Sequence, residues 1–226
     1  MMVQESELKS HLVEAYRKTL AYSCAVEGGC RSSKRTDILN REFASFLFRS
    51  FKNSEDWSVI YEERIKCARA TLENPNKTFS IDVIFTNKKT GRNVYVLLKS
   101  IESSYNKNKE NFANCTVGEV ERIYGHSEKH GDSLREERKN DVTLFFTLLP
   151  RECPVGTKAE RTKYTKPSIK TMRLINENVH QVCAIVDCEN GLSKKNLLNS
   201  LTGCLVNLDE VNHQFEEFFN NVESVL

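Results

Sequence analysis

The 226-residue sequence lacks most of the local patterns that identify common enzyme classes. It contains no GxxxxGKS/T, GxGxxG, GxSxG or HExxH sequence, which argues against P-loop, dinucleotide-binding, α/β-hydrolase and zinc-peptidase chemistry. No apolar run approaches the ~20 residues needed to cross a bilayer, so no membrane span is predicted. Charge is nearly balanced, at 33 Lys plus Arg against 31 Asp plus Glu. Any contact with nucleic acid is therefore expected from a local basic segment.

Cysteine pairs of the kind that bind metals are also missing. The eight cysteines form no CxxC pair, and Cys183 and Cys188 lie in or beside an apolar run. The N-terminus is polar and acidic, unlike a targeting segment. We therefore expect reduced, buried thiols and a cytoplasmic protein.

The length of the chain suits one domain with one core, so we predict a single domain over residues 1–226. Apolar residues at helical spacing predict two N-terminal helices within about 5–51. Thr36 or Asp37 is a plausible N-cap of the second helix. The mixed pattern after these helices predicts a first strand at Ser58–Glu62.

The second half of the chain supplies further strands and a last helix. Continuous apolar runs at Val142–Leu149 and Val182–Val186 predict strands buried on both faces. Asn207 and Glu210 form a capping box that predicts the start of a C-terminal amphipathic helix. The summed order of elements predicts an α/β fold with a central mixed β-sheet flanked by helices.

The most informative stretch is a predicted β-hairpin at about 79–99. Both of its strands are rich in β-branched and aromatic residues, and the Thr90-Gly91 dipeptide marks the tip. Asp82 lies in so apolar a strand that it needs a partner, and Lys99 ends the neighbouring strand. A carboxylate and an ammonium so placed can hold a divalent metal and stabilise a nucleophilic water or a phosphate oxygen.

Asp82, fourteen intervening residues and Leu97-Leu98-Lys99 resemble the core motif of the restriction-endonuclease-like, or PD-(D/E)xK, nucleases. The likeness extends loosely to the order of elements over residues 36–147. It implies a restriction-endonuclease-like fold and a Mg²⁺-dependent, site-specific endonuclease of double-stranded DNA, similar to type II restriction enzymes and acting as a homodimer. The sequence departs from the family at Leu97, where the second metal carboxylate is expected.

The same resemblance implies roles for individual residues. Asp82 would bind Mg²⁺, and Lys99 would position the attacking water and help to deprotonate it. Because some restriction endonucleases carry the second carboxylate on the following helix, Glu119 is the first candidate for the missing acid and Glu110 the second. Glu42, in the helix before the sheet, is a further candidate metal ligand; from its own sequence context it is a solvated helix glutamate.

Two polar segments are candidate DNA contacts, although each also fits a solvated loop. The first follows the candidate lysine, and its hydroxyl, amide and amino groups suit phosphates and base edges. It comprises Ser103, Ser104, Tyr105, Asn106, Lys107 and Asn108. The second is a basic loop at about 156–173, whose six bases oppose the single acid Glu160, a net charge of +5 (six minus one). Its candidate DNA-binding residues are Lys158, Arg161, Lys163 and Lys166.

Leu97 leaves a second interpretation open, in which the chain is a catalytically inactive nuclease-fold protein. Such a protein would bind DNA or a protein partner without cutting. Loss of Mg²⁺-dependent cleavage in Asp82→Asn and Lys99→Ala would indicate an enzyme. Salt-sensitive, metal-independent DNA binding that survives both changes would indicate a binding protein.

Overall fold

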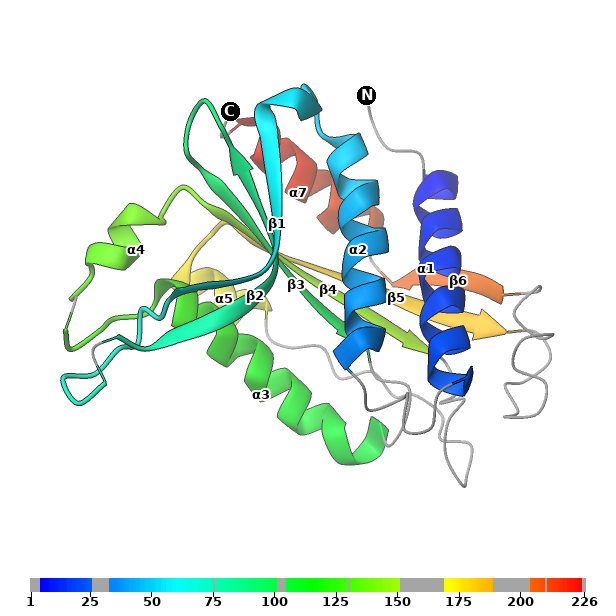
Figure 1. Cartoon of the computed structure of the whole chain (residues 1–226), viewed down its shortest axis with the longest axis horizontal. Coiled ribbons are helices and arrows are strands. Elements are labelled where there is room, and N and C mark those ends of the chain that lie inside the picture. The colour runs from blue at the N-terminus through cyan, green and yellow to red at the C-terminus, as the bar shows by residue number, and fades with distance from the viewer. Residues whose placement is uncertain are drawn as a thin grey trace.

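One six-stranded sheet forms the centre of the molecule (Figure 1). The computed structural model describes residues 5–25, 33–74, 76–100, 105–129, 131–150, 169–188, 204–209 and 211–224. In chain order the elements are α1 (Glu5–Ala25), α2 (Ser33–Ser50), the 3-10 helix η2 (Ser54–Asp56), β1 (Trp57–Lys66), β2 (Thr78–Asn87), β3 (Asn93–Ser100), α3 (Tyr105–Tyr124), α4 (Ser133–Glu137), β4 (Val142–Pro150), α5 (Ile169–Ile175), β5 (Val179–Cys188), β6 (Cys204–Asp209) and α7 (Val211–Ser224). The predicted α/β fold with a central mixed sheet flanked by helices is confirmed.

The strands lie in the sheet in the order of the chain. β1, β2 and β3 form an antiparallel meander, β3, β4 and β5 are parallel, and β6 returns antiparallel to β5. The parallel pairs require crossovers, which contain α3 and α4 between β3 and β4, and α5 between β4 and β5. The carboxyl ends of β3, β4 and β5 consequently lie at one end of the sheet, where open α/β sheets bind their ligands.

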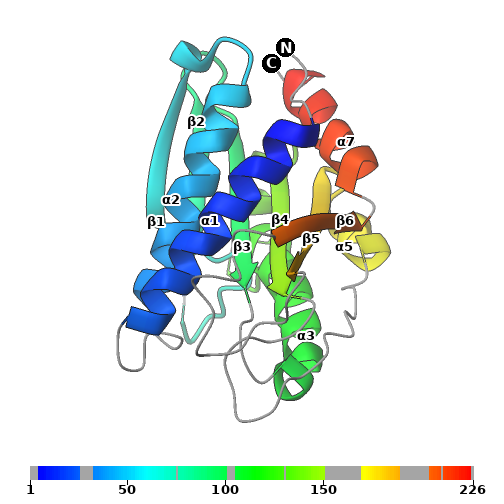
Figure 2. The same cartoon turned by 90° about the vertical axis from the view of Figure 1, so that its right-hand side faces the viewer.

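Three helices cover one face of the sheet. α1 and α2 lie side by side on this face, and α7 lies on it toward β4 and β5 (Figures 1 and 2). The apolar stripe of α2 meets the sheet where the Phe43 and Phe146 rings stack with centroids 4.0 Å apart. From α7, Phe218 is fully buried in the same core cluster. Burial of these aromatic side chains stabilises the packing of this layer on the sheet.

The opposite face is covered by α3 and α5. Tyr95, Leu97 and Phe145 point from the sheet into a second core cluster, which Ile123 of α3 and Met172 of α5 complete. Leu97 is therefore a core residue, with only 2% of its surface exposed. These contacts determine which face of α3 meets the sheet. They therefore also set the positions of the other residues of this helix.

The ribbon formed by β1 and β2 changes the face that it presents near Glu62 and Asp82. Tyr61 packs against the first core cluster, whereas Ile65 packs against the second. Residues four apart in a regular strand share a face, so a local rotation must lie between these two. Glu62 provides it with a left-handed φ of 54°, and the pairing of the two strands continues on either side. Two acidic residues thus meet where the ribbon turns.

The predicted capping box at the C-terminal helix is wrong. Asn207 lies in β6, where it pairs with Ile185 of β5, and the helix begins at Val211. The capping residues were assigned from a local pattern, but pairing with the neighbouring strand satisfies the backbone of Asn207 instead. The first strand was also placed too narrowly, since β1 continues from Glu62 to Lys66.

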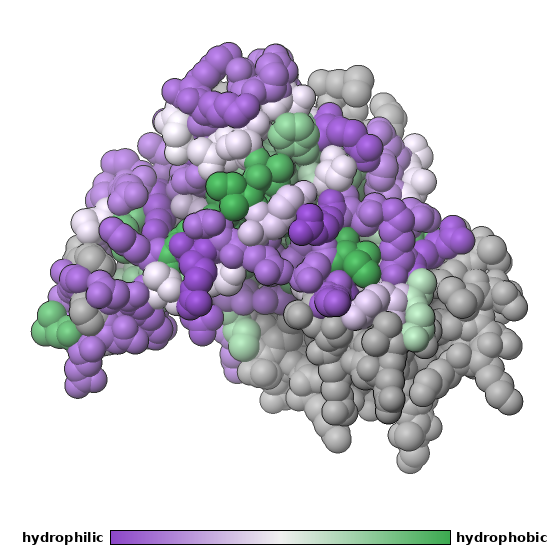
Figure 3. All heavy atoms as spheres, in the orientation of Figure 1, coloured by the Kyte–Doolittle hydropathy of each residue, from purple (hydrophilic) through white to green (hydrophobic). Residues whose placement is uncertain are grey.

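The surface seen in Figure 3 is mostly hydrophilic, with small separate hydrophobic areas over the described residues. Among these residues the most exposed large apolar side chains are Leu174, Leu72 and Ile60. Among the helices that the structure describes, none combines the length and apolar character needed to span a bilayer.

Candidate functional site

The structure brings Asp82 and Lys99 to one place on adjacent strands. The recorded backbone pairing of β2 with β3 reaches Val83 and Val96 and extends toward the hairpin tip. Beyond it, Oδ2 of Asp82 accepts a hydrogen bond from the backbone N–H of Leu98, at 2.7 Å. The carboxylate therefore takes the position of a strand carbonyl, directly beside the residue that precedes Lys99.

Glu119 of α3 joins this pair. The Nζ of Lys99 lies 2.8 Å from Oε1 of Glu119, and the two side chains are 31% and 12% exposed. The second oxygen of Glu119, Oε2, is buried and has no hydrogen-bond partner within the described part of the chain. An ionised oxygen in that position is costly unless it meets a donor or a cation. Asp82, Lys99 and Glu119 together are called the Asp82 site below.

The electrostatics of Asp82 show an excess of negative charge. Burial raises the pKa of Asp82, while the Lys99 ammonium and the Leu98 N–H lower it. The carboxylates of Glu119 and Asp37 raise it further, and the net pKa lies above the ordinary value. A positively charged ligand near Asp82 would therefore be favourable.

Lys99 is held in its charged form by the same carboxylates. Burial lowers the pKa of Lys99, but the charge of Glu119, its hydrogen bond and the charge of Asp82 raise it, and the net pKa lies above the ordinary value. Lys99 is consequently an ammonium at neutral pH. It is suited to stabilise negative charge, and less suited to remove a proton.

Two further acids near the site were missed by the sequence analysis. The neighbouring Asp37 carboxyl raises the pKa of Glu62, and the charge of Asp82 raises it further. Asp37 was interpreted as an N-cap, but α2 begins at Ser33 and Asp37 lies in its first turns. The start of α2 is tied to the end of β3, since Nη2 of Arg35 lies 3.4 Å from the carbonyl oxygen of Ser100.

The sequence does contain a pattern that could have indicated Asp37, the acid on α2. Asp37, Asn40 and Arg41 recur at the i, i+3 and i+4 spacing that places residues on one helix face. These three polar residues form a second face of α2, distinct from the face that buries the phenylalanines. Such a face indicates separate contacts. No comparable signal exists for Glu62, because its position depends on its backbone conformation.

Glu42 lies elsewhere on α2. Its Oε1 is 2.7 Å from Nζ of Lys18 on α1, in an ion pair whose side chains are 37% and 44% exposed. The acid of α2 that acts on Asp82 is Asp37. The structure thus places Glu42 in the contact between the two N-terminal helices.

The remaining candidate residues are only partly described. Tyr105, Asn106, Lys107, Asn108 and Glu110 form the start of α3, and their side chains lie outside the described part of the structure. Several candidates lie wholly outside the described residues. These are Ser103, Ser104, Lys158, Arg161, Lys163 and Lys166.

The oxygen atoms of the Asp82 site fit a hard divalent cation. Asp82 engages one oxygen with a backbone N–H, and Glu119 keeps one buried oxygen that lacks a partner among the described residues. No group of three or more His, Cys, Asp or Glu is arranged to hold a metal ion within the described residues. An ion such as Mg²⁺, which keeps several of its waters and uses one or two carboxylates, matches this set.

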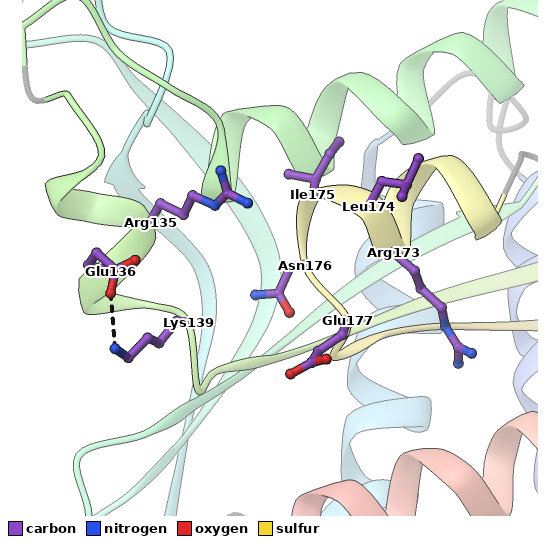
Figure 4. A pocket seen from close by; sticks show the side chains of 8 residues that line it. All are labelled: Arg135, Glu136, Lys139, Arg173, Leu174, Ile175, Asn176 and Glu177. Atoms are coloured by element: carbon purple, nitrogen blue, oxygen red, sulfur yellow. Dashed lines mark hydrogen bonds and ion pairs between the residues drawn. The ribbon is translucent and has the colours of Figure 1, made fainter.

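A hollow lies beside α4 and α5, at the end of the sheet opposite the Asp82 site (Figure 4). Its volume is about 310 Å³. It is lined by Arg135, Glu136, Lys139, Arg173, Leu174, Ile175, Asn176 and Glu177. Most of the charged residues that line it are in ion pairs. Lys139 pairs with Glu136 at 2.9 Å, and Arg173 pairs with Glu217 at 2.7 Å. Arg173, the last base of the predicted basic loop, therefore has a structural contact between α5 and α7.

Comparison with known proteins finds no matching family model, no matching curated protein and no matching solved structure. The interpretation of the site consequently depends on its residues and their arrangement.

Proposed function

We propose that the chain is a Mg²⁺-dependent endonuclease that cuts double-stranded DNA at specific sites. The observation that carries this proposal is the contact of Lys99 with Glu119, beside the Asp82 carboxylate, at the carboxyl end of β3. An ammonium between two acids, in a sheet position where ligands bind, is suited to a phosphate ester and its attacking water. The arrangement agrees with the resemblance to restriction-endonuclease-like nucleases.

Asp82 and Glu119 are the residues that would hold Mg²⁺. The ion would supply neutralisation of the charge that develops on the scissile phosphate. The partnerless Oε2 of Glu119 supports this assignment, because a buried carboxylate oxygen needs a positive partner. Glu119 then replaces the acid that the family carries at the position of Leu97.

Lys99 would act on the reacting groups as a cation. Its Nζ donates to Glu119 and has further N–H groups that can orient a water or contact a phosphate oxygen. Since its net pKa is raised, the ammonium keeps its proton at neutral pH and offsets the negative charge of the transition state. The proton of the attacking water would pass to a carboxylate or to solvent.

DNA and a second copy of the chain are the proposed partners. The start of α3 follows the lysine closely in sequence, and its polar residues suit backbone phosphates. Cleavage of both strands at a symmetric sequence is most simply performed by a two-fold symmetric dimer.

The proposal is tested by incubating the purified protein with mixed plasmid and phage DNA, with Mg²⁺ or with EDTA. We expect discrete fragments in Mg²⁺ only, and none with Asp82→Asn. The matched control is Asp132→Asn, at a carboxylate that is 59% exposed and lies 3.2 Å from Nδ1 of His126. Intact DNA with the wild-type protein in Mg²⁺ and Mn²⁺, across a range of salt, would reject the enzyme.

Leu97 favours a second candidate function, a nuclease-like fold that binds DNA without cutting it. Its side chain belongs to the second core cluster, so the strand position of the missing acid is committed to packing. In that case Asp82→Asn and Lys99→Ala would leave a salt-sensitive, metal-independent DNA affinity. Gel-shift titration of both variants in EDTA distinguishes this outcome from the enzyme.

A further inference from the structure

A second polar hollow lies between α2 and β1, next to the Asp82 site. Its volume is about 140 Å³, and it is lined by Asp37, Asn40, Arg41, Tyr61 and Glu62. Apart from Arg41, these residues carry carboxyl, amide and phenol groups. We call it the Asp37 hollow.

Two carboxyl groups meet in this hollow. Asp37 and Glu62 are close enough to form a side-chain hydrogen bond, which raises the pKa of Glu62 together with the charge repulsion between them. Two carboxylates that line one hollow repel each other, so a cation between them would be favourable. Glu62 is exposed to solvent, so an ion can reach the pair.

Asn40 provides an independent observation. The residue is only 3% exposed, it lines the same hollow, and its Oδ1 has no hydrogen-bond partner in the described part of the chain. An amide oxygen is an acceptor only, and its burial without a donor is unfavourable. Oxygen atoms of carboxylates and of asparagine amides are the ligands that hard divalent cations prefer.

Arg41 supplies one positive charge to the hollow but does not replace an ion. Its guanidinium lies over the Tyr61 ring, 5.0 Å from the centroid, which holds it to one side. One cation against two carboxylates leaves the hollow with a net negative charge. The positive charge of Arg41 therefore lowers the affinity of the hollow for an added cation. Its stacking on Tyr61 keeps the guanidinium to one side, so an ion has room to bind.

We propose that Asp37, Glu62 and Asn40 form a second divalent-cation site, separate from the Asp82 site. The ion would bridge the two carboxylates, accept the amide oxygen of Asn40 as a ligand and keep waters at its other positions. This site follows from the Asp37 hollow and does not depend on DNA cleavage by the protein. Its charge would also offset the effect that Asp37 exerts on Asp82.

The test is a titration of the purified full chain with Mn²⁺. The electron paramagnetic resonance signal of free Mn²⁺ is measured at each step and gives the number of ions bound. We expect Glu62→Gln to bind one Mn²⁺ fewer than the wild type. The matched control is Glu63→Gln, at the next exposed residue of the same strand, which should bind as the wild type does. An unchanged count in Glu62→Gln would overturn the proposal.

Asn40→Asp adds a second reading at the buried ligand. A charged oxygen at this position should tighten Mn²⁺ binding by about tenfold, because ligand charge tunes the affinity of such sites. Weaker or equal binding in a folded Asn40→Asp variant would contradict the assignment of Asn40 as a ligand.

Asp82→Asn separates this proposal from the proposed function. The second site predicts that Asp82→Asn keeps the Mn²⁺ that Glu62→Gln loses. If the protein cuts no DNA but shows this pattern, the nuclease is rejected and the second site stands. If Mn²⁺ binding in all variants depends only on Asp82, the second site is rejected and the nuclease is unaffected.

Discussion

Asp82, which is half-buried, lies beside the carboxyl end of β3, and Asp141, which is buried, lies beside the amino ends of β3 and β4. The surroundings of the two aspartates differ. Asp141 accepts hydrogen bonds from Asn93 N–H at 2.8 Å, from Tyr95 O–H at 2.8 Å and from Asn93 Nδ2 at 3.3 Å. Asp82 accepts one recorded bond, from Leu98 N–H at 2.7 Å. The first carboxylate is satisfied by the fold, whereas the second keeps capacity for a ligand.

The pKa values alone do not separate the two residues. Burial raises the pKa of both carboxyl groups, and hydrogen bonds oppose the effect in each. The difference lies in the neighbours: Asp82 also meets the negative charges of Glu119 and Asp37. A shifted pKa is therefore a sign of function only where the unused acceptors and the local charge agree.

The largest expected effect of a substitution is on the cleavage rate, at the Asp82 site. Lys99→Ala should lower the rate of Mg²⁺-dependent DNA cleavage on the order of 100- to 1000-fold, because it removes a preorganised cation near the developing charge. The control is Lys89→Ala, at a hairpin lysine that is 70% exposed and pairs with Asp56. Single-turnover cleavage of plasmid DNA measures both. Equal rates in the two variants would show that Lys99 has no part in the reaction.

Leu97→Glu tests whether the strand position can accept the missing acid. Since Leu97 is a core residue, the new carboxylate should lower the free energy of unfolding by about 3 kcal/mol or more. Leu97→Met, which conserves volume, should cost less than about 1.5 kcal/mol. Urea unfolding compares the two variants. Similar stabilities would mean that the position tolerates a charge, as an inactive site that has lost its acid would.

Asp141→Ala should act on stability. It leaves the Asn93 N–H and the Tyr95 hydroxyl without their acceptor, at a cost of about 2 to 3 kcal/mol. Asp82→Ala removes one acceptor for a backbone N–H together with one half-buried, repelled charge, so its unfolding free energy should change by less than about 1 kcal/mol. Thermal unfolding at pH 7 would contradict the comparison if the two losses were equal.

A smaller, pH-dependent effect is expected from His180, at the same end of the sheet as Asp141. Burial lowers the pKa of His180 from 6.5 to about 4. The unfolded chain then binds the proton more readily than the folded protein, so this contribution to stability is complete above pH 6.5 and is lost as the pH falls toward 4. The loss reaches up to about 3 kcal/mol. His180→Gln should flatten this part of the stability profile, and an unchanged slope would contradict the assignment.

The sequence was informative about the site where local chemistry determines the structure. The alternation of residues in β2 and β3 was sufficient to place Asp82 and Lys99 near one another. Glu119 was named through the resemblance to nucleases that carry the second carboxylate on the following helix, and the structure places it 2.8 Å from Lys99. The first inference needed only the geometry of two strands, whereas the second needed the family resemblance.

The sequence was uninformative where packing between distant elements decides. Glu62 reaches the site because its left-handed backbone turns β1, and no residue pattern announces that φ. Asp37 lies near Asp82 because the first core cluster seats α2 on the sheet. Asn207 was misassigned because a capping pattern is local, while β6 forms by pairing with β5, which lies outside that pattern.

The most direct test of this account compares Asp82→Ala with Asp141→Ala in one cleavage assay. Rates of plasmid cleavage in Mg²⁺ are measured at a temperature where circular dichroism shows both variants folded. We expect no detectable cleavage by Asp82→Ala and a rate near that of the wild type for Asp141→Ala. Cleavage by Asp82→Ala at the rate of Asp141→Ala would contradict it, and Asp82 would then be a structural carboxylate like its counterpart.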